Sequence, residues 1–162
     1  MWIKGKHYRS IWLDHATQIP QIIDQTLLPF RFSIRPLPDV NAAVEAIRAM
    51  RVRGAPLIGA TAAHGIARAM VADGSDESLA VATAALLDAR PTAVNLRWAL
   101  DRMNASLRDV DYSHREVMAL EEAIRICDED VASCESIGEH GRGLIEDLAA
   151  RKESSGPVQI LT

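Results

Sequence analysis

Residues 56–72 (PLIGATAAHGIARAMVA) form a long apolar run built almost entirely from small side chains. Pro56 suits the first turn of a helix, where its missing backbone N–H costs no hydrogen bond. A helix with so little side-chain bulk is typically packed closely against its neighbours. We therefore expect a buried central helix within a helical domain. The small residues are Gly59, Ala60, Ala62, Ala63, Gly65 and Ala67.

Apolar periodicity predicts further helices on both sides of this run. Asp39 is a suitable N-cap for the helix that precedes it, and we expect Gly54 to cap the C-terminus of that helix. The expected N-cap of the next helix is Asp76 or Ser78, and Pro91 or Thr92 is expected to open the helix after it.

The clearest helical pattern begins at Ser113, which has the spacing of a capping box with Glu116. We expect the helix to end or kink at Gly138. Its apolar stripe is expected to pack in the core or against another subunit, so that both cysteines are buried and unreactive. The stripe comprises Val117, Leu120, Ile124, Cys127, Val131 and Cys134.

The two ends of the chain have a different character from its helical middle. Residues 1–38 contain short alternations of apolar and polar residues and four prolines, which favours strands and turns. At the other end, residues 158–161 (VQIL) follow a turn and are typical of a buried strand. Because a lone apolar strand leaves its backbone groups unpaired, we expect a longer protein in which a second, α/β domain begins here.

The sequence thus predicts a mainly α fold in three parts. A strand-rich N-terminal segment spans residues 1–38, and a helical bundle domain spans residues 39–153. Residues 154–162 form a linker and the first strand of the α/β domain.

Composition excludes several classes of protein. The net charge is −4 without a long basic run, so we expect no nucleic-acid partner. The N-terminus lacks a signal-peptide pattern, and no apolar run approaches membrane-spanning length. With two cysteines too far apart along one helix to pair, a cytoplasmic protein without a membrane partner is expected. No metal-ligand pattern, Walker loop or dinucleotide fingerprint is present.

Two short motifs point to an anion site. In RGAP and RPT, an arginine (Arg53 or Arg90) stands just before a proline expected to open a helix. The free N–H groups at a helix N-terminus favour an anion, and guanidinium groups bind phosphate in bidentate fashion. The alternative is that each arginine only follows the C-terminus of the preceding helix, where the dipole favours a cation.

Two histidines are candidate metal ligands, but the sequence around neither of them favours that role. His64 lies within the small-residue run without Cys, Asp or Glu at ligand spacing, so we expect a packed core histidine. His140 stands beside glycines in EHGRG, which is typical of a turn between helices.

The motifs together resemble the N-terminal part of the methylthioribose-1-phosphate isomerase family. They are IIDQTLLP, AIRAMRVRGAPLIGATAAHGIA, RPTAVNLRWAL, IGEHG and GPVQILT, and they occur in order from about Ile22 to Thr162. RGAPLIG is shared with the wider superfamily, which includes regulatory subunits of translation initiation factor 2B. DQTLLP and RPTAVNL point to the isomerase branch.

This resemblance implies a fold, a reaction and a site. The helical domain would precede a Rossmann-like domain, and the protein would be a homodimer without metal or organic cofactor. Its substrate would be the sugar phosphate 5-methylthioribose 1-phosphate, isomerised to the ribulose 1-phosphate in methionine salvage. The resemblance places substrate contacts at Arg53, Gly54, Ala55 and Arg90.

The same resemblance places the catalytic cysteine and aspartate beyond Thr162, so these residues alone are expected to be inactive. Two alternatives remain open at this point. The substrate could be another sugar phosphate such as ribose 1,5-bisphosphate, or the chain could belong to a non-catalytic interaction module of the initiation-factor kind.

Overall fold

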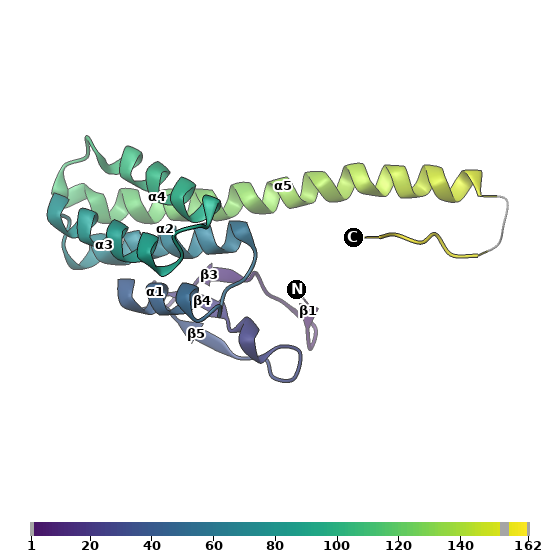
Figure 1. Cartoon of the computed structure of the whole chain (residues 1–162), viewed down its shortest axis with the longest axis horizontal. Helices are drawn as coiled ribbons and strands as arrows, with labels where there is room; N and C mark the ends of the chain where they lie inside the picture. Colours follow the sequence, from purple (N-terminus) through teal and green to yellow (C-terminus); the bar gives the residue numbers. More distant parts are fainter. Residues whose placement is uncertain (1, 153–155, 162) are drawn as a thin grey trace. The chain divides into compact units, whose positions relative to one another are not determined.

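The computed structural model describes residues 2–152 and 156–161, and its fold is mainly α-helical, as expected. The chain divides into two compact units, Met1–Cys127 and Asp128–Thr162. The first unit contains the N-terminal strands and the first four α-helices (Figure 1). The division into segments at residues 38 and 153 remains a prediction.

Short antiparallel strands make up the N-terminal part, confirming its strand-rich character. Strands β1 and β2 form a hairpin, and a separate three-stranded sheet has the order β3-β4-β5. Ile22 lies opposite Ile11 on one side and Arg35 on the other, and its side chain is fully buried. The elements are β1 Trp2–Ile3, β2 Lys6–His7, β3 Ile11–Leu13, β4 Pro20–Ile23, the short 3₁₀ helix η1 Gln25–Leu27 and β5 Ile34–Pro36.

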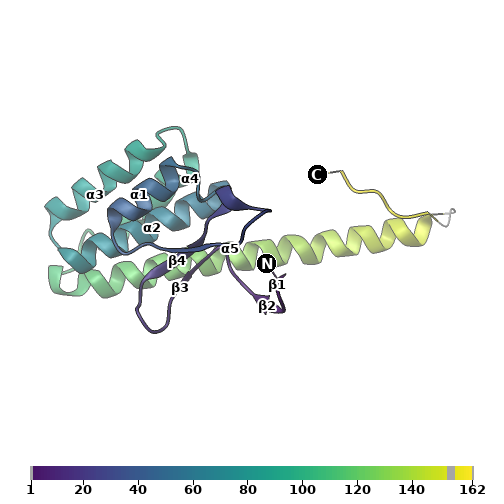
Figure 2. The same cartoon turned by 90° about the horizontal axis from the view of Figure 1, so that it is seen from below.

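The small-residue run forms α2, which is buried over most of its length, as predicted. This helix contacts α1, α3 and α4, and Figures 1 and 2 show the four helices grouped together. The helices are α1 Val40–Arg48, α2 Ala55–Ala72, α3 Asp76–Ala89, α4 Val94–Leu107, the 3₁₀ helix η2 Tyr112–His114 and α5 Arg115–Arg151.

Glycine allows α2 and α4 to approach closely. A Cβ atom added to Gly59 would lie 2.8 Å from the carbonyl oxygen of Asn95 and 3.3 Å from the Cβ of Ala99. Because the Asn95 oxygen belongs to the backbone of α4, the clash could be relieved only by moving one helix. The second turn of α2 is therefore held against the start of α4.

Replacing Gly59 by alanine is expected to lower the free energy of unfolding by about 1–3 kcal/mol, the usual range for overpacking. Gly138→Ala is the matched control, because a Cβ there meets nothing within 4 Å. Alanine favours a helix over glycine, so the control should not destabilise the protein. Urea unfolding followed by circular dichroism measures both. Equal effects of the two substitutions would show that the α2–α4 contact is not tight.

The helix starts were predicted with mixed success. Asp39 caps α1 by accepting a hydrogen bond from the Ala42 backbone N–H, as expected. However, the prediction for Gly54 was wrong. Ala49 is the C-cap of α1 and is followed by Met50 in the left-handed region, while Gly54, at φ 92°, is the N-cap of α2. The segment between these helices includes Arg51, whose side chain forms an ion pair with Asp24.

The starts of the next three helices differ in detail from the prediction. Ser75, rather than a later residue, caps α3, and its side chain accepts from the Ser78 N–H. Pro91 and Thr92 form a turn, so that α4 begins at Val94. The capping box at Ser113 is not formed, because that residue belongs to η2 and its hydroxyl lies 3.3 Å from His114 Nδ1.

Within the first unit, α5 packs through a different face from the predicted apolar stripe. Val117 is 57% exposed, and Cys127 is only half-buried. The buried face of α5 carries Ala119 and Ala123, whose small side chains allow the helix to pack closely on the core. It also carries Glu122, which is buried and pairs with Arg102 of α4. The buried residues of α5 are Arg115, Ala119, Glu122, Ala123 and Ile126.

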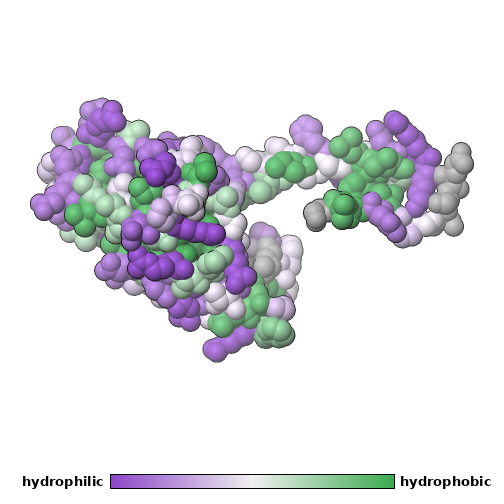
Figure 3. All heavy atoms as spheres, viewed as in Figure 1, coloured by the Kyte–Doolittle hydropathy of each residue, from purple (hydrophilic) through white to green (hydrophobic). Residues whose placement is uncertain are grey.

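The second unit consists of the last part of α5 and an extended segment. The helix continues through Gly138 to Arg151, and Cys134 is exposed rather than buried. The strand expected at residues 158–161 is not formed, because no strand in the described part of the chain pairs with it. Exposed apolar side chains appear in Figure 3 and include Ile137, Leu144, Ile145 and Leu148. None of the helices described is long and apolar enough to cross a membrane.

Candidate functional site

Three of the four predicted site residues lie at the start of α2. Arg53 is exposed, and its Nε donates a long hydrogen bond of 3.4 Å to the Met50 carbonyl. Gly54 is the N-cap, and its φ of 92° is a conformation that glycine adopts without strain. Ala55 is the first helical residue, followed by Pro56. The backbone here is therefore open to solvent and accessible to a ligand.

The fourth residue, Arg90, lies in the connection between α3 and α4. It is the C-cap of α3 and is half-buried, and its carbonyl accepts a hydrogen bond from the Ala93 N–H. This tight turn places Arg90 four residues before the first residue of α4.

The starts of α2 and α4 share a feature that α1 and α3 lack. Asp39 and Ser75 cap α1 and α3 with their side chains, whereas Gly54 and Ala93 provide no side-chain cap for α2 and α4. Neither α2 nor α4 has an acidic residue in its first turn. Gly59 in the second turn of α2 packs against Asn95 near the start of α4, and the uncapped N–H groups and positive dipole ends of both helices favour an anion.

The nearby arginines differ in whether a carboxylate already pairs with them. Within the described residues, neither Arg53 nor Arg90 forms an ion pair with a carboxylate. By contrast, Arg51 donates to Glu45 at 2.7 and 2.8 Å and to Asp24 at 2.8 Å. Arg51 is therefore a structural residue, whereas no carboxylate of the described residues neutralises the charges of Arg53 and Arg90.

Asp24 anchors the loop that leads to Arg53, a role that the sequence did not reveal. Its side chain is fully buried and accepts hydrogen bonds from Thr26, Arg35 and Arg51. The Gln25 N–H also donates to the Arg51 carbonyl at 2.9 Å. The available signal was an aspartate after two isoleucines with a threonine two residues later, a pattern typical of a side-chain-capped turn.

The electrostatics of Asp24 follow from these contacts. Burial alone would raise the pKa of its carboxyl, but the hydrogen bonds from Thr26, Arg35 and Arg51 outweigh burial and lower the pKa to about 2. The carboxylate is therefore charged at neutral pH and holds Arg51 in place.

The four predicted site residues supply binding groups. Backbone N–H groups and guanidinium groups stabilise the charge of a phosphate, but neither accepts a proton at neutral pH. Arg53, Gly54, Ala55 and Arg90 can therefore orient a sugar phosphate, while proton transfer on the sugar requires other residues.

The predictions for the two histidines had different outcomes. His64 is packed in the core with 2% exposure, as predicted. His140 lies within α5 rather than in a turn, and its Nδ1 is 2.7 Å from the Ser136 carbonyl. In the described part of the chain, no group of three or more His, Cys, Asp or Glu side chains could hold a metal ion.

His64 should make the stability of the protein depend on pH. Burial lowers the pKa of its ring from 6.5 to about 4, so the unfolded chain binds the proton more strongly than the folded one. Stability is then complete above pH 6.5 and falls as the pH decreases towards 4, by at most about 3 kcal/mol. Urea unfolding across this range should show the slope in the natural protein and lose it in His64→Phe. The exposed His140→Phe is the control, and an unchanged slope in His64→Phe would rule out this assignment.

Comparison with known proteins shows the family to which this chain belongs. The profile of the initiation factor 2 subunit family matches residues 51–150. The chain belongs to this family.

Particular relatives are isomerases. Over its whole length, the chain is 51% identical to the methylthioribose-1-phosphate isomerase of Methylorubrum extorquens, of which it covers 44%. It is 48% identical to the isomerase of the same name from Escherichia coli, again covering 44% of that protein. The resemblance read from the motifs is confirmed, and the chain spans less than half the length of these isomerases.

Solved structures support the same relationship. The 5-methylthioribose 1-phosphate isomerase from Pyrococcus horikoshii matches with a TM-score of 0.70 and 34% identity, over 78% of this chain and 37% of that one. The delta subunit of translation initiation factor eIF-2B from A. fulgidus matches with a TM-score of 0.69 and 36% identity, over 77% of this chain and 38% of that one.

Proposed function

We propose that this chain is the N-terminal part of an aldose–ketose isomerase that converts 5-methylthioribose 1-phosphate to 5-methylthioribulose 1-phosphate in methionine salvage. The main support is the similarity to isomerases of that name along the entire chain. The uncapped starts of α2 and α4 provide the matching chemistry, since they favour the phosphate of the substrate.

In this proposal the chain binds the substrate and the rest of the protein completes the chemistry. Arg53, Gly54, Ala55 and Arg90 contact the sugar phosphate, and the catalytic cysteine and aspartate lie beyond Thr162. The whole protein acts as a cytoplasmic homodimer without a metal or organic cofactor, and the isolated chain produces no product.

A regulatory interaction module is the second candidate. The structural match to the initiation factor subunit favours it, with nearly the same TM-score as the match to an isomerase. In that case, the helical domain would contact other subunits and would have no need of a sugar phosphate.

Titration of the isotope-labelled chain with 5-methylthioribose 1-phosphate separates the two candidates. We expect saturable NMR shifts of the backbone N–H groups of Gly54 and Ala55, and of the Arg53 and Arg90 side chains. Ribose 1,5-bisphosphate added as a competitor tests the choice of sugar, and it should displace the first ligand only weakly. Saturable shifts confined to other residues, or none at millimolar ligand, would favour the interaction module.

A further inference from the structure

A cavity of about 450 Å³ lies on the outer face of the three-stranded sheet. Ile11 and Ile22, on the opposite face, belong to the hydrophobic core. Trp12 of β3 lies directly opposite Gln21 of β4, so these two side chains share the outer face and both line the cavity. The volume is within the usual range for small-molecule sites, and the cavity shares no residue with the candidate anion site.

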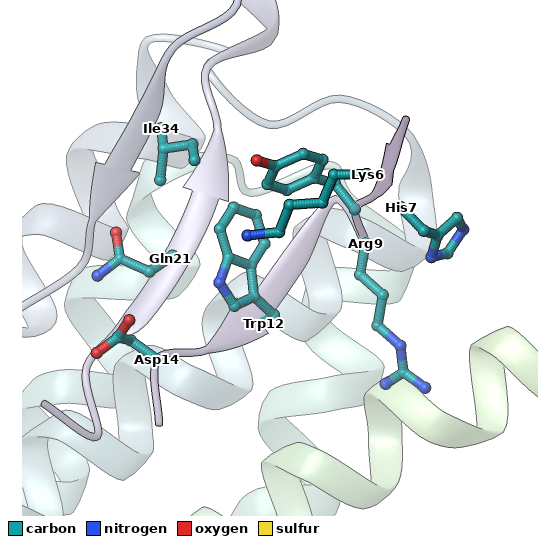
Figure 4. Close-up of a pocket in the computed structure, with 8 residues that line it drawn as sticks. Lys6, His7, Arg9, Trp12, Asp14, Gln21 and Ile34 are labelled. Carbon is teal, nitrogen blue, oxygen red and sulfur yellow. The ribbon is translucent and has the colours of Figure 1, made fainter. Parts of the chain in front are cut away.

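Two opposite charges line this cavity. Figure 4 shows Lys6 extending from β2 towards the indole of Trp12, whereas Asp14 lies beside Gln21. Asp14 comes two residues after Trp12 and therefore continues the same face of the sheet. A hydrogen bond from the Thr17 backbone N–H is the main cause that lowers the pKa of Asp14, so its carboxylate is charged at neutral pH.

Several polar groups of the cavity have no partner. Among residues 2–152 and 156–161, the indole N–H of Trp12 and the carboxamide of Gln21 form no hydrogen bond, and Lys6 forms no ion pair. Asp14 accepts hydrogen bonds from its own turn through Oδ1, which leaves Oδ2 for a ligand. Because Trp12 and Gln21 are half-buried, water reaches them only in part, and a ligand that pairs with them would gain affinity.

Apolar surface completes the lining of the cavity. It comes from Ile34 and from the rings of Tyr8 and Trp12, whose centroids are 5.7 Å apart. His7 and Arg9 also line the cavity, but Figure 4 shows their side chains extending away from the indole. The lysine and the aspartate therefore supply one charge of each sign beside an apolar surface.

We propose that this cavity binds the zwitterion of an α-amino acid with an apolar side chain. The ligand's carboxylate pairs with Lys6, its ammonium group pairs with Asp14, and its side chain packs against Trp12 and Ile34. A ligand with a single charge would satisfy one of the two groups and leave the other unpaired. The inference goes beyond the proposed isomerase activity and does not depend on it, because the two sites share no residue.

Three probes with the same phenylethyl body test this inference. L-Phenylalanine carries both charges, 3-phenylpropionate lacks the ammonium group, and phenethylamine lacks the carboxylate. Titration of the isotope-labelled chain should show saturable NMR shifts of the Trp12 indole and the Lys6 side chain. L-Phenylalanine should bind about tenfold more tightly than either analogue, as expected for one additional charge-assisted hydrogen bond. Equal affinity for all three probes, or no shift of the indole, overturns the proposal.

Matched variants assign each charge of the ligand to one side chain. Lys6→Gln should weaken L-phenylalanine and 3-phenylpropionate about tenfold and leave phenethylamine unchanged. Asp14→Asn keeps the Oδ1 atom that caps its turn, and it should weaken L-phenylalanine and phenethylamine but not 3-phenylpropionate. Arg48→Gln removes an exposed charge outside the cavity and should change none of the affinities. The assignment is wrong if Lys6→Gln and Asp14→Asn affect the three probes alike, and the comparison of probes on the natural protein decides the case where a variant does not fold.

Discussion

Replacing Asp24 by alanine is expected to lower the free energy of unfolding by about 3 kcal/mol, the lower end of the range for a broken buried ion pair. Its carboxylate is fully buried and pairs with Arg35 at 2.6 Å and with Arg51 at 2.8 Å. The effect should not be larger, because Arg35 is 46% exposed and water can solvate its charge after the substitution. Urea unfolding of the natural protein and of the variant gives the difference.

The matched control for this substitution is Asp88→Ala. Asp88 also pairs with an arginine, Arg48, but both side chains are largely exposed. Such surface pairs contribute about 0–1 kcal/mol. If Asp24→Ala and Asp88→Ala destabilise the protein equally, the anchoring role of Asp24 is wrong.

Acid provides an independent test of Asp24. Its pKa is lowered from 3.8 to about 2 in the folded protein, so the unfolded chain takes up the proton first. The stabilisation is present above pH 3.8 and is lost as the pH falls from 3.8 towards 2. This window lies below that of His64, so the two residues can be distinguished by unfolding at several pH values. Asp24→Ala should reduce the dependence in the lower window alone, and the remainder comes from Asp14, Asp73 and Asp76, whose pKa values are also lowered.

Replacing Arg53 by alanine is expected to weaken the binding of 5-methylthioribose 1-phosphate by about 10- to 100-fold. The variant removes a charge-assisted hydrogen bond to phosphate, which contributes about 1.5–3 kcal/mol. Because the Arg53 guanidinium makes only one long bond within the described part of the protein, at 3.4 Å to the Met50 carbonyl, stability should hardly change. Calorimetric titration measures the affinity, and thermal unfolding checks the stability.

Arg48→Ala controls for the general loss of positive charge. Arg48 is the last residue of α1 and pairs with Asp88 at the surface. It should leave the affinity for the sugar phosphate within about twofold, as expected for a charge screened by solvent and salt. If Arg48→Ala weakens binding as much as Arg53→Ala, the ligand responds to net charge and RGAP is not a specific phosphate site.

The central helix could be predicted from its sequence because one physical constraint dominates it. The small residues of α2 are useful only where other helices approach closely, and the contact at Gly59 shows this approach. The N-cap at Asp39 was predictable for a similar reason, since a local hydrogen bond to the Ala42 N–H determines it.

The packing face of α5 could not be predicted in the same way. Apolar periodicity selected large side chains such as Val117, but the core lies against Ala119 and Ala123. A close helix contact favours small residues, and their hydrophobic signal is weak. Arg115 is buried because it donates to the carbonyls of Gly74 and Val110 and pairs with Asp76, contacts that involve distant parts of the chain.

The candidate site was predicted in part for related reasons. Arg53 and Arg90 were selected as site candidates because they stand beside helix-opening motifs, which are local features of the sequence, and this assignment stays a prediction. The anchoring role of Asp24 depends on a contact with Arg51, 27 residues away, and such a contact leaves no periodic pattern. The family resemblance selected Arg53 and not Arg51 as a substrate contact, and the fold shows that Arg51 is paired with Asp24 and Glu45.

A chimeric enzyme tests the central claim most directly. Residues 1–162 would replace the corresponding part of the Methylorubrum extorquens isomerase, to which they are 51% identical. We expect the chimera to convert 5-methylthioribose 1-phosphate to the ribulose 1-phosphate, and its Arg53→Ala variant to lose about 100-fold or more in kcat/KM. The unmodified isomerase and an analogous chimera with the Escherichia coli sequence control for the junction. A folded chimera without turnover, when both controls are active, would contradict the proposed function.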